Sequence, residues 1–271
     1  MPEQFEPGLP DEEQAYEHVL DMVAGRVEIA GDYKFNSWLG VFGVVPVGVT
    51  TVEAGFKDID GQLFEDFSSI HHRTETVIGV ADIHLGVNLY PLPQDLWKNT
   101  DLEVGLGATL PTGSVEPDPF VKGAQGLTHQ HMFYGTGTVN PLIRVILKQQ
   151  LGKGMAVAWG QGIFSLYRGK HDYRGSSVVA GGIGGSYPVL IDRLSVSLQH
   201  EVFYESAARW GDNVARNSGR TDLILTAGLM WSEATWSAQL SAKHPYRITT
   251  SGDQLEAPVL LSLDLFYKFP L

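Results

Sequence analysis

The stretch LSLDLFYKFPL, residues 261–271, decides the fold because large apolar residues recur in it at every second position. In an extended chain one face holds Leu261, Leu263, Leu265, Tyr267, Phe269 and Leu271, and the other holds Ser262, Asp264, Phe266 and Lys268. Successive side chains of a strand point to opposite sides, so a period of two predicts a strand with one continuous apolar face.

The same alternation recurs along the chain from Arg26 onward, punctuated by glycine, proline and aspartate. Clear examples are Trp236 to Lys243, Leu194 to Val202 and Leu102 to Leu110. The alternating segments begin near residues 26, 38, 62, 75, 101, 133, 154, 176, 194, 220, 235 and 257. This pattern predicts an antiparallel all-β fold of about twelve strands, an even number as in bacterial outer-membrane barrels.

Composition separates a membrane barrel from a soluble β-sandwich, since both bury one face of every strand. Only 18% of the residues are charged, against about 25% in typical soluble domains. The polar faces of the segments are rich in glycine, serine and glutamine, which suits a confined, hydrated lumen. The longest apolar run, Trp38 to Val49, is too short for a membrane helix and contains Pro46. We therefore predict a transmembrane β-barrel in the outer membrane of a Gram-negative bacterium, in contact with its lipid and lipopolysaccharide.

The first residues have a different composition. Residues 1–24 are acidic, and the segment between Pro10 and Gly25 predicts a short helix with Asp11 as N-cap and Tyr16, Val19, Leu20 and Val23 on one face. We expect two parts, an acidic N-terminal extension (1–24) and an outer-membrane barrel (25–271). The extension is either a solvated terminus or a plug or docking segment for an envelope protein.

Two short motifs carry a resemblance to a known family. The segment from Asp101 to Pro141 contains DLEVGLGATLPTG, a polar loop and FYGTGTVNP. This resembles the Leu-Pro-Thr-Gly and Gly-(Ser/Thr)-Gly-Thr signature of outer-membrane transporter-like barrels, a group that includes the family named for the meta pathway of phenol degradation. The resemblance implies a barrel in which an outward strand ends in LPTG and the chain returns through the second glycine motif.

Alternation also predicts which titratable side chains line the lumen. These belong to many strands, and in a closed barrel they would project into one interior: Asp82, His84, Glu103, Arg144, Lys148, Glu201, Asp222, Lys243, Asp264 and Lys268. Acidic and basic members are nearly balanced, so we expect no strong ion selectivity. Either the charges set the field of a narrow channel, or they pair with one another and fill it.

Histidines are the candidate metal ligands. His129 and His131 flank Gln130, and in an extended segment an i, i+2 pair places both imidazoles on one face. His71 and His72 lie in another loop beside Asp66. Neutral imidazole with nearby carboxylate suits copper or zinc, so these residues predict a capture site for such ions. The alternative is that these loop histidines are solvated or hydrogen-bonded.

Several functional classes are excluded, and three stay open. With 19 basic against 31 acidic residues a nucleic-acid partner is not expected, and with no cysteine there is no thiolate metal site. We expect a channel or transporter for small molecules, either hydrophobic or aromatic compounds or metal ions. The alternatives are a scaffold that docks envelope proteins through residues 1–24 or loops 111–130 and 205–220, and a lipid hydrolase built around the outward-facing His200. The chain has no Gly-X-Ser-X-Gly elbow, so we expect no enzyme activity.

Overall fold

The computed structural model describes residues 17–58, 60–63, 74–93, 96–127, 129–130, 132–215, 218–250 and 259–269. The chain divides into two compact units, each described here by itself. Unit 1 consists of Met1–Ile29, Val44–Ile83 and Pro111–Gly137, and unit 2 of Ala30–Gly43, His84–Leu110 and Thr138–Leu271. Among the residues with a described placement, no helix is long and apolar enough to cross a membrane.

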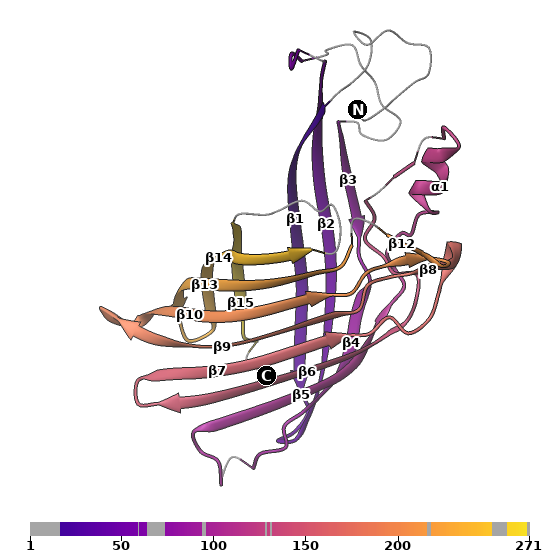
Figure 1. Cartoon of the computed structure of the whole chain (residues 1–271). Helices are drawn as coiled ribbons and strands as arrows, with labels where there is room; N and C mark the ends of the chain where they lie inside the picture. The colour runs from indigo at the N-terminus through magenta and orange to yellow at the C-terminus, as the bar shows by residue number, and fades with distance from the viewer. Residues whose placement is uncertain are drawn as a thin grey trace. The chain divides into compact units, whose positions relative to one another are not determined.

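One antiparallel sheet contains nearly all of the regular structure (Figure 1). Its strands are β1 (Glu17–Lys34), β2 (Leu39–Lys57), β3 (Glu75–Val80), β4 (Ile83–Leu89), β5 (Thr100–Leu110), β6 (Asn140–Leu151), β7 (Gly154–Ile163), β9 (Val178–Val189), β10 (Ile191–Glu205), β13 (Arg220–Ser232), β14 (Trp236–Thr250) and β15 (Leu260–Tyr267). They follow one another in the order β1-β2-β4-β5-β6-β7-β9-β10-β13-β14-β15, and β3 also pairs with β2. Each strand therefore neighbours the next in sequence, as in an up-and-down meander.

The predicted all-β antiparallel fold is confirmed, and the sheet has 12 strands. Two of these, β3 and β4, are separated in sequence only by Ala81 and Asp82. The segment predicted near residue 62 lies mostly outside the described residues, and Leu63 makes only an isolated bridge with Lys57.

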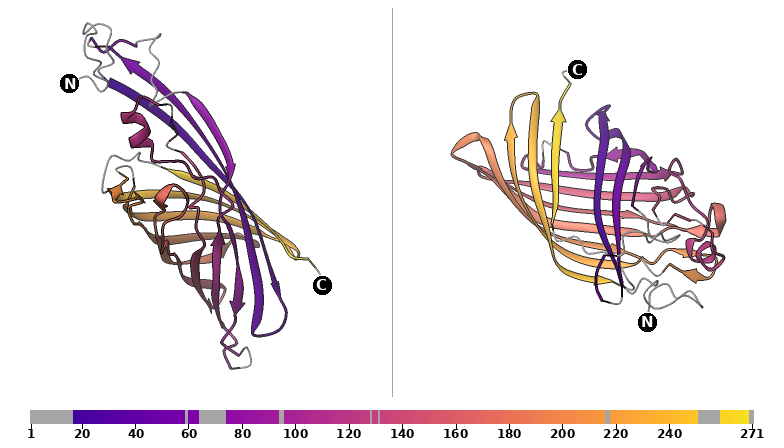
Figure 2. Two further views of the ribbon diagram at one scale, coloured as in Figure 1. Left: turned by 90° about the vertical axis from the view of Figure 1, so that its right-hand side faces the viewer. Right: turned by 90° about the horizontal axis from the view of Figure 1, so that it is seen from above.

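In unit 2 three connections at one end of the sheet are single turns, and the connections at the other end are longer. Single turns join β6 to β7, β9 to β10 and β13 to β14. At the opposite end, residues 164–177 and, among the described residues, 206–215 and 218–219 belong to longer loops. These loops contain the 3-10 turn η2 (Lys170–Asp172) and a small sheet of β8 (Tyr173–Arg174), β11 (Arg209–Trp210) and β12 (Asn213–Val214). Figure 2 shows the strands from β5 to β15 side by side in a curved sheet.

The two loops of unit 2 are tied together by ring packing and by charge. The rings of Tyr173 and Trp210 lie 4.7 Å apart between centroids. The Arg168 guanidinium is 2.9 Å from Asp212 and 3.3 Å from Asp172. The hydrogen bond to Asp212 and the negative charge of Asp172 raise the pKa of Arg168 above its usual value. In unit 1 the loop after β5 contains the one-turn helix α1 (Pro119–Ala124).

The helix predicted between Pro10 and Gly25 is wrong over its second half, because β1 begins at Glu17 and pairs with β2. Residues 1–16 lie outside the described part of the chain. Val19, Val23, Val27 and Ile29 are all exposed on β1, and they also fit a period of two. Pairing with a neighbouring strand outweighs the weak helical preference of so short a segment.

The segment predicted to start a strand near residue 133 forms no strand until Asn140, where β6 begins. The preceding residues are instead held by side-chain contacts within unit 1, described below.

Candidate luminal site

The strand register of unit 2 places polar side chains on one continuous face of the sheet. Arg144 is opposite both Gly105 and Gln161, and Gly182 is opposite both Trp159 and Glu201. Directly opposed residues of an antiparallel pair point to the same side, so these rows connect from strand to strand. We call this side the polar face; it extends from β5 to β15.

The other side of the same strands is apolar and exposed. Ile183 and Leu198 are 67% and 57% exposed, and Leu229, Leu240 and Leu263 are similar. A soluble sheet would cover such a face, whereas a membrane barrel turns it toward lipid. We call this side the apolar face.

Arg144 is the centre of a first polar cluster. Its Nη2 atom donates to Glu103 Oε1 at 2.8 Å and to Asn88 Oδ1 at 3.1 Å. The guanidinium carbon lies 4.1 Å from the centroid of the Phe42 ring, a cation–π contact. A Cβ atom at Gly105 would be 2.5 Å from Arg144 Cγ, so glycine at that position lets the arginine lie flat on the sheet.

A small cavity of about 220 Å³ borders this cluster. Its charged lining residues are Lys34, Asp101, Glu103 and Lys148. Lys34 Nζ lies 3.9 Å from the centroid of the Tyr90 ring, which also lines the cavity. Two cations and two carboxylates thus share one hollow, and Asp101 and Lys148 are directly opposed on β5 and β6.

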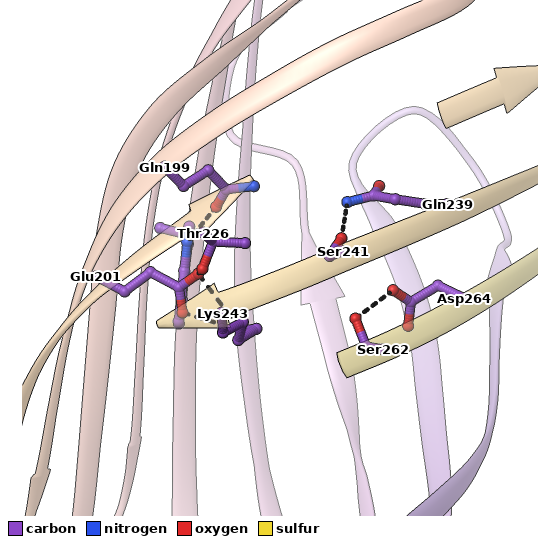
Figure 3. A network of polar contacts seen from close by, with 9 residues as sticks. Gln199, Glu201, Thr226, Gln239, Ser241, Lys243, Ser262 and Asp264 are labelled. Carbon is purple, nitrogen blue, oxygen red and sulfur yellow. Dashed lines mark hydrogen bonds and ion pairs between the residues drawn. The ribbon is translucent and has the colours of Figure 1, made fainter. Parts of the chain in front are cut away.

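Glu201 is the centre of a second cluster (Figure 3). Its carboxylate, 5% exposed, accepts hydrogen bonds from the Thr226 hydroxyl and, at 3.0 Å, from Lys243 Nζ. The three residues come from β10, β13 and β14 and point toward one another on the polar face. Further along that face Gln239 donates to Ser241 at 3.0 Å, and Ser262 donates to Asp264 at 3.4 Å.

Glycines on β9 make room for this cluster. Trp159 Nε1 on β7 donates to Gln199 Oε1 on β10 at 3.2 Å, across the intervening strand. A Cβ atom at Gly182 would lie 2.9 Å from Trp159 Nε1, and one at Gly184 would lie 2.5 Å from Gln199 Cγ. The glycine-rich sequence of β9 therefore lets long side chains from both neighbours cross over it.

The remaining predicted lumen residues of unit 2 are placed as follows. Asp222 is 4% exposed and is 2.7 Å from Arg220 Nη2. His84 is half-buried on β4, and Lys268 is exposed just beyond β15. The structure thus brings together Glu103 with Arg144 and Glu201 with Lys243, whereas Asp264 bonds to a serine.

Asp82, also a predicted lumen residue, has a structural position in unit 1. Its buried carboxylate accepts hydrogen bonds from Gly113 N at 3.0 Å, Thr136 N at 2.9 Å and Thr136 Oγ1 at 2.5 Å. Thr112 Oγ1 donates to Ala81 O at 2.8 Å and accepts from Ile83 N at 3.0 Å. The LPTG and GTGT motifs are therefore fastened to the break between β3 and β4. We call this arrangement the Asp82 clasp.

Tyr134 extends the contact of this loop along β2 and β3. Its hydroxyl lies 2.9 Å from Thr50 Oγ1 and 3.1 Å from Val77 O. Its ring occupies the space over Gly48 and Gly79, where Cβ atoms would lie 2.3 and 3.0 Å from ring carbons. These contacts hold residues 132–138 against the two strands, which is why the segment is not itself a strand.

Only one of the four predicted metal ligands lies in the described part of the chain. His129 is buried, and its Nδ1 atom is 2.8 Å from Leu127 O. His71, His72 and His131 lie outside the described residues. Within the described ranges no group of three or more histidine, cysteine, aspartate or glutamate side chains could hold a metal ion. Copper or zinc binding stays a prediction.

His200 lies on the apolar face, opposite Leu225 and Ile183. Its Nε2 atom is hydrogen-bonded to the Tyr246 hydroxyl, and the two rings are 5.7 Å apart between centroids. The residues beside it on β10, Leu198 and Val202, are exposed and apolar.

Sequence reasoning missed the neutral partners of the charged pairs, namely Asn88, Trp159, Gln199 and Thr226. All four occupy polar-face positions of the alternation. All four are neutral amide, hydroxyl or indole groups, whereas the predicted set contains titratable side chains alone.

Comparisons with known proteins support the fold. No protein-family model matches the sequence, and no curated protein matches it. Among solved structures the chain is similar to an outer membrane channel from Pseudomonas putida F1, with a TM-score of 0.61 and 14% identity over 95% of this chain and 87% of that chain. In vitro folded OmpT of Vibrio cholerae has a TM-score of 0.38 and 10% identity over 92% of this chain and 97% of that chain. The relation to the phenol meta pathway stays a prediction. The chain has the fold of the outer-membrane β-barrels.

Proposed function

We propose that the chain is an outer-membrane channel for small molecules and that the polar face lines its lumen. The observation that carries this proposal is the continuity of that face across β5 to β15, with exposed leucine and isoleucine on the opposite side. A sheet with lipid on one side and water on the other needs this division. On this proposal the chain resides in the outer membrane of a Gram-negative bacterium, with the long loops outside and the short turns in the periplasm.

The lumen of such a channel would discriminate weakly between anions and cations. Arg144 is paired with Glu103, and Lys243 with Glu201, so both of these cations have a carboxylate within 3.0 Å. Paired charges leave a small net field for a passing ion. The aromatic rings of Trp159, Phe42 and Phe203 lie among the polar groups. We propose small aromatic compounds as the cargo class, because they fit a lining of aromatic rings and polar side chains.

Substituted cysteines test the assignment of the two faces, because the chain has no native cysteine. Ser262→Cys places a thiol on the polar face of β15, and Leu263→Cys, the matched control, places one on the apolar face next to it. A charged, membrane-impermeant thiol reagent should lower the single-channel conductance of Ser262→Cys in planar bilayers and leave Leu263→Cys unchanged. A correctly folded, heat-modifiable protein that never conducts would refute the channel and favour the scaffold role.

We further propose that the chain is not a lipid hydrolase. A hydrolase on the lipid-facing wall needs a serine activated by its histidine. The hydrogen-bond partner of the outward His200 is a tyrosine hydroxyl, a group suited to positioning a lipid. Phospholipid hydrolysis by the detergent-solubilised protein that disappears in His200→Ala would contradict this proposal.

A further inference from the structure

A group of polar and cationic residues interrupts the apolar face of unit 2. His200 on β10 is opposite Leu225 on β13, which is opposite His244 on β14. The register of β13 and β14 shifts between Leu223 and Ile224, which pair with Arg247 and Pro245, so Tyr246 is an extra residue there. Such a bulge re-aims side chains. We call His200, His244, Tyr246 and Arg247 the outer-wall patch; all four are exposed.

The acidic residues of the same strands that face the lumen side are paired with other cations, and Arg247 is the charged member of the patch to consider. Glu201 and Asp222 lie on the polar face, where they pair with Lys243 and Arg220. Arg247 makes no ion pair within the part of the chain that the structure describes. A guanidinium that has no carboxylate partner among the described residues, beside leucine and valine, is costly in hydrocarbon and favourable where anionic headgroups lie.

The patch lies at the level of one membrane boundary. Trp236 and Tyr267, paired and exposed at the short-turn end, mark one aromatic belt. Tyr246 lies about ten residues further along β14, which at about 3.3 Å per residue and a tilt of about 45° is about 23 Å. Apolar bands of outer-membrane barrels are about 25 Å tall. Tyr246 therefore belongs to the second belt, at the end with the long loops.

We propose that the outer-wall patch binds the phosphorylated sugar headgroup of the anionic glycolipid of the outer leaflet, lipid A. This inference rests on the proposed location of the barrel, with its long loops outside. Arg247 supplies a planar fork that matches a phosphate group. His244 and His200 add ring nitrogens, and the hydrogen bond between His200 and Tyr246 positions the tyrosine hydroxyl beside them. The tyrosine ring presents a flat surface to a sugar, and the neighbouring Leu198 and Leu225 accept acyl chains.

Native mass spectrometry of the full chain in detergent micelles tests this site with diphosphoryl lipid A as the probe. Loss of a charge-assisted bidentate contact should weaken lipid A binding by Arg247→Gln about tenfold or more. Arg193→Gln is the matched control, because Arg193 is an exposed arginine at the short-turn end of β10, paired with Glu233 at 2.9 Å. It should bind lipid A as the wild type does.

Three results would overturn the proposal: equal binding by Arg247→Gln and wild type, equal weakening by Arg193→Gln, or full displacement of lipid A by millimolar inorganic phosphate. The proposal would be supported if lipid A stays bound in the presence of inorganic phosphate and in the presence of phosphatidylcholine. Conductance in planar bilayers separates this proposal from the channel. If Arg247→Gln conducts normally and binds lipid A as the wild type does, only the lipid site is refuted. If neither the wild type nor Arg247→Gln conducts, yet lipid A binding depends on Arg247, only the channel is refuted.

Discussion

The Asp82 clasp makes a quantitative prediction about stability. In Asp82→Asn the amide keeps one acceptor oxygen, for Gly113 N, but turns an NH2 group toward Thr136, whose hydroxyl can rotate to accept while its backbone N–H loses its acceptor. A hydrogen bond to a charged group contributes about 1.5–3 kcal/mol, and an unsatisfied buried donor costs about 1–3 kcal/mol. Asp82 is only 5% exposed, so water replaces the lost acceptor poorly. We expect Asp82→Asn to lower the free energy of unfolding by about 3–4 kcal/mol.

A graded series refines this prediction. Thr136→Val removes the hydroxyl and keeps the backbone N–H, so it should cost about 1–2 kcal/mol. Because both substitutions act on the same carboxylate, the double variant should lose less than the sum of the two. Asp192→Asn is the control: Asp192 is 94% exposed and lies 3.9 Å from Lys153, and such surface pairs contribute about 0–1 kcal/mol.

The assay is urea unfolding of the protein folded into lipid vesicles, followed by tryptophan fluorescence. If Asp82→Asn unfolds within about 0.5 kcal/mol of the wild type, the three hydrogen bonds do not hold the loop, and the structural reading of the LPTG and GTGT motifs is refuted.

Three further predictions concern the polar face and the histidines. Glu201→Gln leaves the Lys243 ammonium without its carboxylate, so we expect the free energy of unfolding to fall by about 3 kcal/mol and the reversal potential to shift toward anions. The double variant Glu201→Leu with Lys243→Met should recover most of the stability. A double variant no more stable than Glu201→Gln would contradict this. Gly184→Val should abolish heat-modifiability on gels, because its Cβ would lie 2.3 Å from a backbone oxygen of β10, whereas Gly160→Ala, with 3.9 Å to the nearest atom, should fold normally. His129→Ala with His131→Ala should abolish copper or zinc binding in calorimetry, and unchanged binding would remove these residues as ligands.

Much of the fold was predictable because apolar residues recur at every second position within the sequence of each strand, whichever strand it pairs with. The alternation at Leu261 to Tyr267 corresponds to β15, and Trp236 to Lys243 to the first half of β14. Two segments were predicted wrongly for different reasons. Residues 17–24 have too few turns for helical spacing to be decisive, and the residues before Asn140 are held by contacts with β2 and β3 that are distant in sequence.

The candidate site was less predictable, because it depends on register. Alternation correctly placed Glu201 and Lys243 on one side of their strands, but only the pairing of β10, β13 and β14 brings the carboxylate and the ammonium within 3.0 Å. For Asp82, alternation did not indicate the hydrogen-bond partners at all. Its position in the alternation suggested a lumen residue, whereas its bonding partners are 31 and 54 residues away in sequence.

The meeting of Gly113 and Gly135 has a practical consequence for work with this protein. A Cβ atom at Gly113 would lie 2.5 Å from Gly135 Cα, so the chain leaves the clasp and returns to it at the same point. The tip around α1 can then be cut, lengthened or exchanged while both roots of the loop stay anchored. Residues 124–127, which are exposed at the end of α1, are accordingly the place to insert an epitope tag or a protease site, and such a graft would report which side of the membrane this loop occupies in living cells.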